Sequence, residues 1–377
     1  MKNIHSKKLT ALKISSVILS FLFYTGCKSS PSNSAPQSYD VTVANRVAKG
    51  PGEISVMTFN VENTFDTVHN DGTDDYTYLP LNQKNTPTVK AFCKSMSNPY
   101  YRNECYTKNW DKPVMDFKLS QISKVISYVD SGRGPDNLIL AEVENLNILT
   151  ELVQGHLTNL GYKTISILKG PDTRGINTAF ISKFPQVGKS ILHIIPYHDA
   201  DPEKEKKAQK SRGILETTVK INNKDVTFLA AHFPSQSNPT EWRHQAIDFM
   251  KNLMQDMQSK GRTVIAGGDL NIIEEEETQF GYFNKILASV GSVSHLVGCK
   301  KCQGTHYYKG QWAFLDVLVF SNNLQQVAGL TLIPDSFEVV KAPAHTNPKG
   351  NPIRFDEIKR EGVSDHFPLY SRLKISL

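Results

Sequence analysis

The stretch 263–271 reads TVIAGGDLN, an apolar run followed by two glycines, an acid and an amide. Its β-branched residues favour a strand, and the glycines allow the backbone to turn tightly where that strand ends. The pattern therefore places Asp269 and Asn271 at one edge of a sheet. Carboxylate and amide groups that gather at such an edge can hold a hard cation.

Three other stretches repeat this arrangement of polar residues beside an apolar, strand-like run. TFNVEN (58–63) contains Asn60, LAEVEN (140–145) contains Glu142, and SDHF (364–367) contains Asp365 and His366. If the strands belong to packed sheets, these side chains can meet at one rim.

The remaining pattern predicts an α/β fold (α+β in arrangement), with two packed mixed β-sheets flanked by helices. Strand-length apolar runs recur between turn residues. Helical spacing of apolar residues covers 117–129, 146–160 and 241–257. Three polar segments interrupt the pattern, at 66–116, 197–212 and 341–362, and loops of this length are usually functional or mobile.

The N-terminal residues are typical of an export signal. Four lysines precede an apolar run over 14–24 that is too short to favour a permanent membrane span. The residues that end in Cys27 resemble a bacterial lipobox, in which the cysteine carries lipid; the alternative is an ordinary signal peptide with an incidental cysteine. We expect a signal peptide at 1–26, a flexible Ser- and Pro-rich tether at 27–52 and a catalytic domain at 53–377. The expected location is the bacterial cell envelope, anchored to a membrane and facing the periplasm or the cell surface.

The charge of the chain argues against strong, sequence-blind binding of nucleic acid. The formal net charge is +6, but without the four lysines of residues 1–26 only 39 basic residues face 37 acidic ones. A domain that binds nucleic acid by charge alone is usually more basic. Any contact with nucleic acid must come from a local patch.

Four cysteines remain after Cys27, in two local pairs. An oxidising compartment permits disulfides, so we expect Cys93–Cys105 and Cys299–Cys302. The CxxC pair could instead be half of a zinc site, but the chain has no second CxxC pair.

The order Asn60, Glu142, His232, Asp269-x-Asn271, Asp316, Asp365-His366 resembles that of the endonuclease/exonuclease/phosphatase superfamily, of the deoxyribonuclease I type. The resemblance spans about residues 53–377 and implies a four-layer α/β sandwich. It also implies a metal-dependent hydrolase of phosphate esters.

The resemblance assigns a role to each position. Glu142 is the expected metal ligand, with Asn60 and Asp365 joining or supporting the site. The expected cofactor is Mg²⁺, with Mn²⁺ or Ca²⁺ as alternatives.

The catalytic residues implied are His366, oriented by Asp316, together with Asp269, which acts on the attacking water. His232 and Asn271 are expected to contact the phosphate.

Substrate-binding residues are less well defined by their sequence context. Arg174 and Arg212 stand where family members often place basic residues, and Ser235 is expected to orient the loop after His232. Arg243 is a poorer candidate. In the segment 304–312, the tyrosines either stack on a base or, as we expect, pack under a loop.

The first prediction of function is an exported, membrane-tethered nuclease. The alternatives are a phosphoesterase of lipids or inositol phosphates, and a lipoprotein that binds without catalysis. The expected partners are nucleic acid as substrate and a membrane through Cys27. No protein partner is indicated, and we expect a monomer.

Overall fold

The computed structural model describes residues 47–299 and 302–376. The predicted signal peptide, Cys27 and most of the predicted tether lie outside these ranges, so the anchor stays a prediction. Within the described ranges, no helix combines the length and the apolar composition needed to cross a bilayer.

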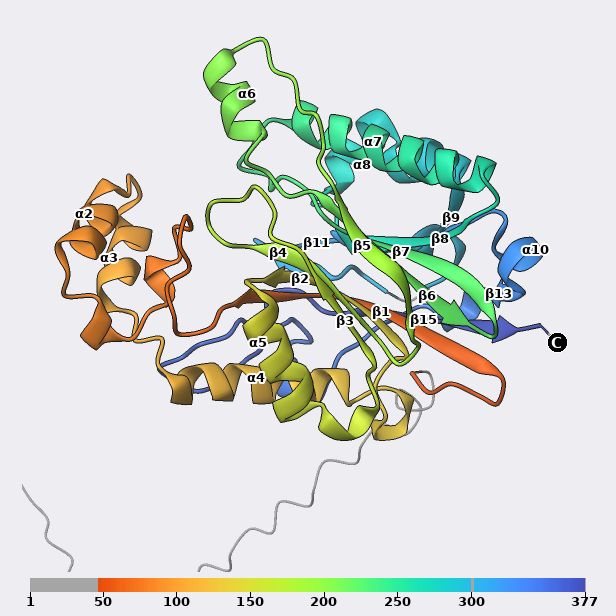
Figure 1. Ribbon diagram of the computed structural model, residues 1–377, viewed down its shortest axis with the longest axis horizontal. Helices are drawn as coiled ribbons and strands as arrows, with labels where there is room; N and C mark the ends of the chain where they lie inside the picture. Colours follow the sequence, from red (N-terminus) through yellow and green to blue (C-terminus); the bar gives the residue numbers. More distant parts are fainter. Residues whose placement is uncertain (1–46, 300–301, 377) are drawn as a thin grey trace, which may run out of the picture. The chain divides into compact units, whose positions relative to one another are not determined.

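Two β-sheets form the centre of the described residues (Figure 1). The first contains, in spatial order, β13 (Leu330–Leu332), β15 (Leu369–Ile375), β1 (Glu53–Thr64), β2 (Asn137–Val143), β4 (Asn177–Ser182) and β3 (Thr164–Ile167), with β14 (Glu338–Val339) beside β15. The second contains β5 (Gln186–His193), β6 (Ile214–Ile221), β7 (Lys224–His232), β8 (Thr263–Asp269), β12 (Asp316–Ser321) and β9 (Gly291–Val293). Two adjacent pairs run parallel, β1 with β2 and β7 with β8.

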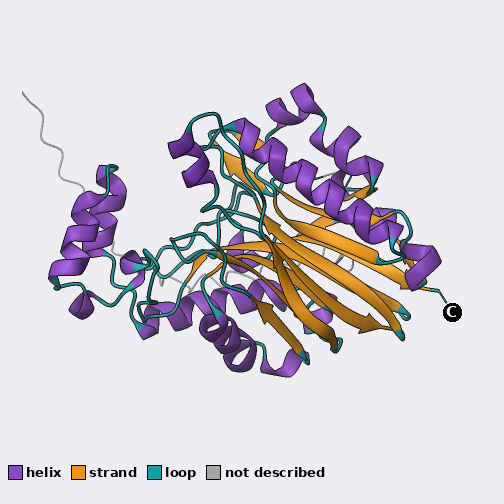
Figure 2. Ribbon diagram, turned by 45° about the horizontal axis from the view of Figure 1, so that its top comes forward, coloured by secondary structure: helices purple, strands orange, loops and turns teal. Residues whose placement is uncertain are grey.

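Helices cover the outer face of each sheet (Figure 2). Helices α4 (Lys112–Ile126) and α5 (Leu146–Glu151) lie against the first sheet, and α7 (Thr240–Ser259) lies against the second. Helix α4 begins where the Asp111 side chain accepts a hydrogen bond from the Val114 amide, with a proline in the first turn. The four layers confirm the predicted α/β sandwich.

Alternation along the strands explains how the layers pack. On β1, Met57 and Phe59 point toward the helical layer, where they join Leu119 and Ile122 of α4. Val56 points the other way and packs between the two sheets with Phe228 of β7. Because successive side chains of a strand face opposite sides, an unbroken apolar run is what a strand buried on both faces requires.

The polar segments contain helices that the sequence patterns did not reveal. Segment 66–116 folds α2 (Pro87–Ser95) and α3 (Pro99–Thr107), and segment 197–212 folds α6 (Pro202–Ala208). Thr86 and Asn98 cap α2 and α3 with their side chains, each directly before a proline, and α2 buries one face through Val89 and Cys93. The helix expected over 146–160 is present but irregular, because α5 continues as a π-helix at Leu152–His156 and is followed by a 3₁₀ turn at Thr158–Leu160. The other elements are α8 (Glu274–Phe280), α9 (Ser294–Val297), α10 (Leu324–Ala328) and a hairpin of β10 (His306–Tyr308) with β11 (Gln311–Ala313).

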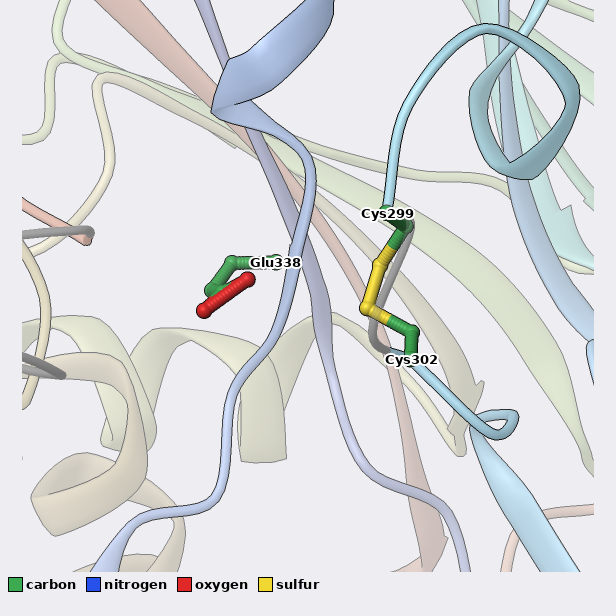
Figure 3. A group of neighbouring side chains, drawn as sticks. All are labelled: Cys299, Cys302 and Glu338. Carbon is green, nitrogen blue, oxygen red and sulfur yellow. A yellow bond between two sulfur atoms is a disulfide. The ribbon is translucent and has the colours of Figure 1, made fainter.

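Both predicted cysteine pairs are joined in the structure. Cys93 and Cys105 link α2 to α3, and Cys299 is bonded to Cys302. Figure 3 shows the second pair with the Glu338 side chain nearby. Sulfur atoms bonded to each other offer no thiolate, so this geometry does not favour the zinc alternative.

Candidate active site

Strand register brings the polar residues of the second sheet into one row. In the parallel pair of β7 and β8, His232 lies beside Asp269. In the antiparallel pair of β8 and β12, Asp269 lies opposite Asp316. Three residues that are far apart in sequence thus share one edge of this sheet.

The first sheet supplies the facing residues, and Asn60 connects the two sheets. Its Nδ2 donates to Oδ2 of Asp269 over 2.9 Å and to Oε1 of Glu142 over 3.3 Å. Its Oδ1 accepts from the backbone amide of Glu62 over 3.0 Å. Asn60 therefore holds two carboxylates with its nitrogen while its oxygen is occupied by the backbone, which fits a supporting role better than direct ligation of a metal.

The backbone around these residues departs from regular strand geometry. The pairing of β1 with β2 shifts register between Asn60 and Thr64, and Glu142 has a φ of 65°. Such bulges and left-handed residues re-aim side chains at functional sites. At Gly268, with a φ of 137°, a Cβ atom would lie 1.8 Å from the Ala231 carbonyl oxygen, so only glycine lets β8 approach β7 this closely.

His366 is held in a fixed orientation. Its Nδ1 lies 2.7 Å from Oδ2 of the fully buried Asp316, and its Nε2 lies 3.8 Å from Oδ2 of Asp269. Although burial alone would lower it, Asp316 and Asp269 hold the pKa of His366 well above its usual value. This side chain is therefore a cation that can donate a hydrogen bond through Nε2.

Asp269 is buried and held by neighbouring donors. Besides the bond from Asn60, its Oδ1 accepts from the backbone amide of Asn271 over 3.0 Å. Burial raises the pKa of Asp269 to about 7, with the charge of His366 opposing and that of Asp316 adding to the rise. A carboxyl group with such a pKa can exchange a proton near neutral pH.

The His232 ring forms a hydrogen bond with the side chain of Arg212. Its Nε2 accepts from Nη2 of Arg212 over 2.6 Å, and its Nδ1 has no hydrogen-bond partner among the described residues. Burial, together with the positive charges of Arg212 and Arg174, holds the pKa of His232 well below its usual value. The ring is therefore neutral and positions the buried Arg212. Arg174 lies at the rim, where it pairs with Asp172 at 2.8 Å and keeps 56% of its side chain exposed.

The loop after His232 is held from behind by Arg243. The guanidinium of this buried residue donates to the carbonyl oxygens of Ser235 and Asn238 over 2.8 and 3.1 Å. The Ser235 hydroxyl bonds with Ser237 and accepts from Asn238, and no hydrogen bond joins it to His232, Asp269 or His366. Asn271 donates to the Phe233 carbonyl oxygen over 3.2 Å, so it too stabilises this loop.

The acidic residues at the rim match the chemistry of a hard cation. Glu142 accepts from the Asn63 amide over 2.8 Å and keeps 18% of its side chain exposed; Asp365 is 27% exposed. Although burial would lower it, nearby carboxylates, including both of these, raise the pKa of Arg354. An acid-rich, partly open set of oxygen donors is what Mg²⁺ prefers.

Two residues of this site were missed by the sequence reasoning. Arg354 donates to Glu62 over 2.8 Å and lies 3.7 Å from Asp365. The ring of His306 lies 4.7 Å from that of His366, measured between centroids. Each belongs to a segment already noted, 341–362 and 304–312, but no spacing singled out the residue itself.

A family model described as the endonuclease/exonuclease/phosphatase family matches residues 89–375, most of the chain. The chain belongs to this family. It is therefore a phosphoesterase of the endonuclease/exonuclease/phosphatase type, which confirms the resemblance predicted from the order of the motifs. No curated protein matches the sequence.

Several solved structures share the fold at low sequence identity. A family protein from Bacteroides thetaiotaomicron has a TM-score of 0.52 at 13% identity, covering 87% of this chain and all of its own. Humanized D. rerio TDP2 has a TM-score of 0.51 at 12% identity, with coverage of 85% and 99%. A mannosyl-6-phosphatase of B. thetaiotaomicron has a TM-score of 0.51 at 14% identity, again with coverage of 85% and 99%. At such identities the likeness concerns the fold alone.

Proposed function

We propose that this phosphoesterase is a divalent-cation-dependent phosphodiesterase of nucleic acids, exported and tethered to a membrane through Cys27. One observation carries the catalytic part: the Asn60 amide bonds to Asp269 of the other sheet over 2.9 Å. This contact joins the proposed metal-binding side of the site to the pair of His366 and Asp316.

In this proposal, three side chains accept the proton of water and stabilise the negative charge on the phosphate. Asp269, with its pKa raised to about 7 by burial, accepts a proton from the attacking water. His366, kept protonated by Asp316, donates a hydrogen bond to the phosphate as negative charge develops. Arg212, fixed by His232, supplies a second positive group.

Glu142 and Asp365 are the residues that would hold the cation. When bound, Mg²⁺ would neutralise charge on the phosphate oxygens. This assignment is supported by the acidic groups at the rim, where the carboxylates of Glu62, Asp365 and Glu142 all act on the single guanidinium of Arg354.

A specific surface favours nucleic acid as the substrate. Tyr308, on the β10–β11 hairpin, is 62% exposed, and Nζ of Lys309 lies 5.1 Å from its ring centroid. The same hairpin touches His366 through His306. An exposed aromatic ring with a neighbouring cation is how sequence-tolerant proteins stack a base and hold the backbone beside it.

A second candidate is a phosphodiesterase of lipids. Helix α3 exposes Tyr100 and Tyr101, with 70% and 55% of their surfaces accessible. Tyrosine favours the boundary between apolar and aqueous phases. Two exposed tyrosines on one short helix are suited to contact a lipid surface.

The test is hydrolysis of plasmid DNA, RNA, sphingomyelin and an inositol phosphate, each with Mg²⁺ and with EDTA. We expect cleavage of nucleic acid that EDTA abolishes. His366→Ala and Glu142→Gln should each reduce turnover by at least about 10²-fold while the far-ultraviolet circular dichroism is unchanged. Wild-type turnover in either variant would reject the site.

A matched pair of variants separates the two substrates. Tyr308→Ala should raise KM for single-stranded DNA and leave hydrolysis of a small phosphodiester unchanged. Tyr100→Ala should reduce only the hydrolysis of lipids presented in vesicles. Turnover of sphingomyelin alone would favour the second candidate, and no turnover of any substrate would favour a binding lipoprotein.

A further inference from the structure

The β10–β11 hairpin places an additional imidazole beside the proposed active site. His306 is the first residue of β10, and its backbone forms a bridge with that of His366. The ligand atoms of His306, Asp365 and His366 all lie within 4.8 Å of one another. No hydrogen bond joins the ring of His306 to any of the described residues, so its nitrogens are available to a ligand.

The backbone under this group is tightly held. Thr305 is fully buried; its carbonyl oxygen accepts from the Phe367 amide over 2.7 Å, and its hydroxyl accepts from the Asp316 amide over 3.1 Å. The hairpin is thus bonded to the two segments that carry the catalytic pair. A site whose ligands sit on such connected backbone is preorganised.

The donor set shares Asp365 with the one expected to hold Mg²⁺, but its other two ligands are imidazoles. Two imidazoles and one carboxylate, with an open side toward solvent at Asp365, match the three protein ligands of an open zinc site. Borderline cations prefer imidazole, whereas Mg²⁺ prefers oxygen. Asp316 holds Nδ1 of His366 and so directs its Nε2 outward, as second-shell carboxylates do for zinc-ligating histidines.

We propose that His306, Asp365 and His366 form a site for a borderline divalent cation such as Zn²⁺, and that its occupation inhibits hydrolysis. The inhibitory part rests on the proposed function. A cation on His366 takes the nitrogen lone pair that otherwise holds the proton donated toward the phosphate.

Direct binding of Zn²⁺ to the metal-stripped full chain tests the site independently of activity. Calorimetry with ZnCl₂ in excess Mg²⁺ should show one site per chain, and X-ray absorption should show two imidazole ligands. His306→Gln should weaken binding by about 100-fold or more and remove one imidazole signal. The control is His198→Gln, at a histidine outside this site whose side chain is 81% exposed; it should change neither the Zn²⁺ affinity nor the number of imidazole ligands. Asp365→Asn provides a second variant and should also weaken Zn²⁺ binding, whatever its activity.

Hydrolysis then tests the inhibition. Low concentrations of Zn²⁺ should inhibit the wild-type protein in excess Mg²⁺. With the turnover of each protein measured relative to its own value without Zn²⁺, His306→Gln should need a Zn²⁺ concentration about 100-fold higher for the same fractional inhibition. Equal Zn²⁺ affinity in wild type and His306→Gln would overturn the site. Half-inhibition of both proteins at the same Zn²⁺ concentration would overturn the inhibitory role of the site. If the wild type cleaves none of the substrates, the proposed function fails, while the binding experiments still decide whether the site exists.

Discussion

The ion pair between Arg243 and Glu276 predicts a large and specific loss of stability when one partner is removed. Arg243 of α7 is 1% exposed, and its Nε lies 2.9 and 3.1 Å from the two carboxylate oxygens of Glu276 of α8. The same guanidinium donates to carbonyl oxygens of the loop after His232. Arg243→Met keeps most of the side-chain volume and removes all of these donors.

The expected cost follows from the charge that is left behind. Glu276 is 6% exposed, and without Arg243 it keeps Thr240 at 2.8 Å and Gln236 at 3.1 Å as donors. Removing one partner of a buried ion pair typically lowers the free energy of unfolding by about 3–5 kcal/mol. Because two donors to Glu276 remain, we expect a loss of about 3 kcal/mol. In Arg243→Met/Glu276→Gln no charge is stranded, so the double variant should be more stable than the single one.

Urea unfolding of the three proteins measures these differences through the midpoint of the transition. The single variant should unfold at a clearly lower urea concentration, and the double variant should recover part of the loss. Hydrolysis should fall in parallel, because the loop that Arg243 holds also binds Asn271. A midpoint for Arg243→Met equal to that of the wild type, or a double variant less stable than the single one, would refute the reasoning.

Three further results are expected. Burial lowers the pKa of His345 from its ordinary 6.5 to about 3, so between these pH values the unfolded chain binds a proton that the folded one does not. The free energy of unfolding should therefore fall by about 1.4 kcal/mol per pH unit between pH 6.5 and about 3, and His345→Gln should flatten this dependence in urea unfolding at several pH values. Because burial raises the pKa of Asp269 to about 7, kcat/KM should rise as the pH increases through 7. A rise at clearly lower pH in excess Mg²⁺ would contradict this prediction and would mean that the bound cation lowers the pKa of Asp269 more than burial raises it. Cys93→Ser/Cys105→Ser should speed tryptic cleavage within 87–107, read by mass spectrometry, since the disulfide spans a separation of 12 residues; an unchanged cleavage rate would mean that packing alone holds α2 against α3.

The motifs were predicted at strand ends; in the structure most of them lie there, whereas Asn60 lies inside β1, beside its register shift. In the second sheet, the strand register places His232, Asp269 and Asp316 beside one another at one edge. The two sheets and their helical layers followed from apolar runs and helical spacing. Long-range order was thus encoded in local patterns.

The directions of individual side chains were beyond these patterns. The family motif does not say which end of the Asn60 amide faces Asp269, because that depends on a backbone amide two residues away. Arg354 and His306 reach the site through tertiary packing of irregular segments. Helices α2 and α3 were missed because each is only 9 residues long within a polar segment, so that capping residues and a disulfide mark them better than apolar spacing does.

The place of β15 within the first sheet has a consequence for biosynthesis. This strand lies between β13 and β1, with Glu53 of β1 paired to Lys374. A chain emerging from the ribosome therefore cannot close the sheet until residues 369–375 have been made. If the protein is exported as proposed, late closure would leave the nascent chain open long enough for threading through a translocation channel.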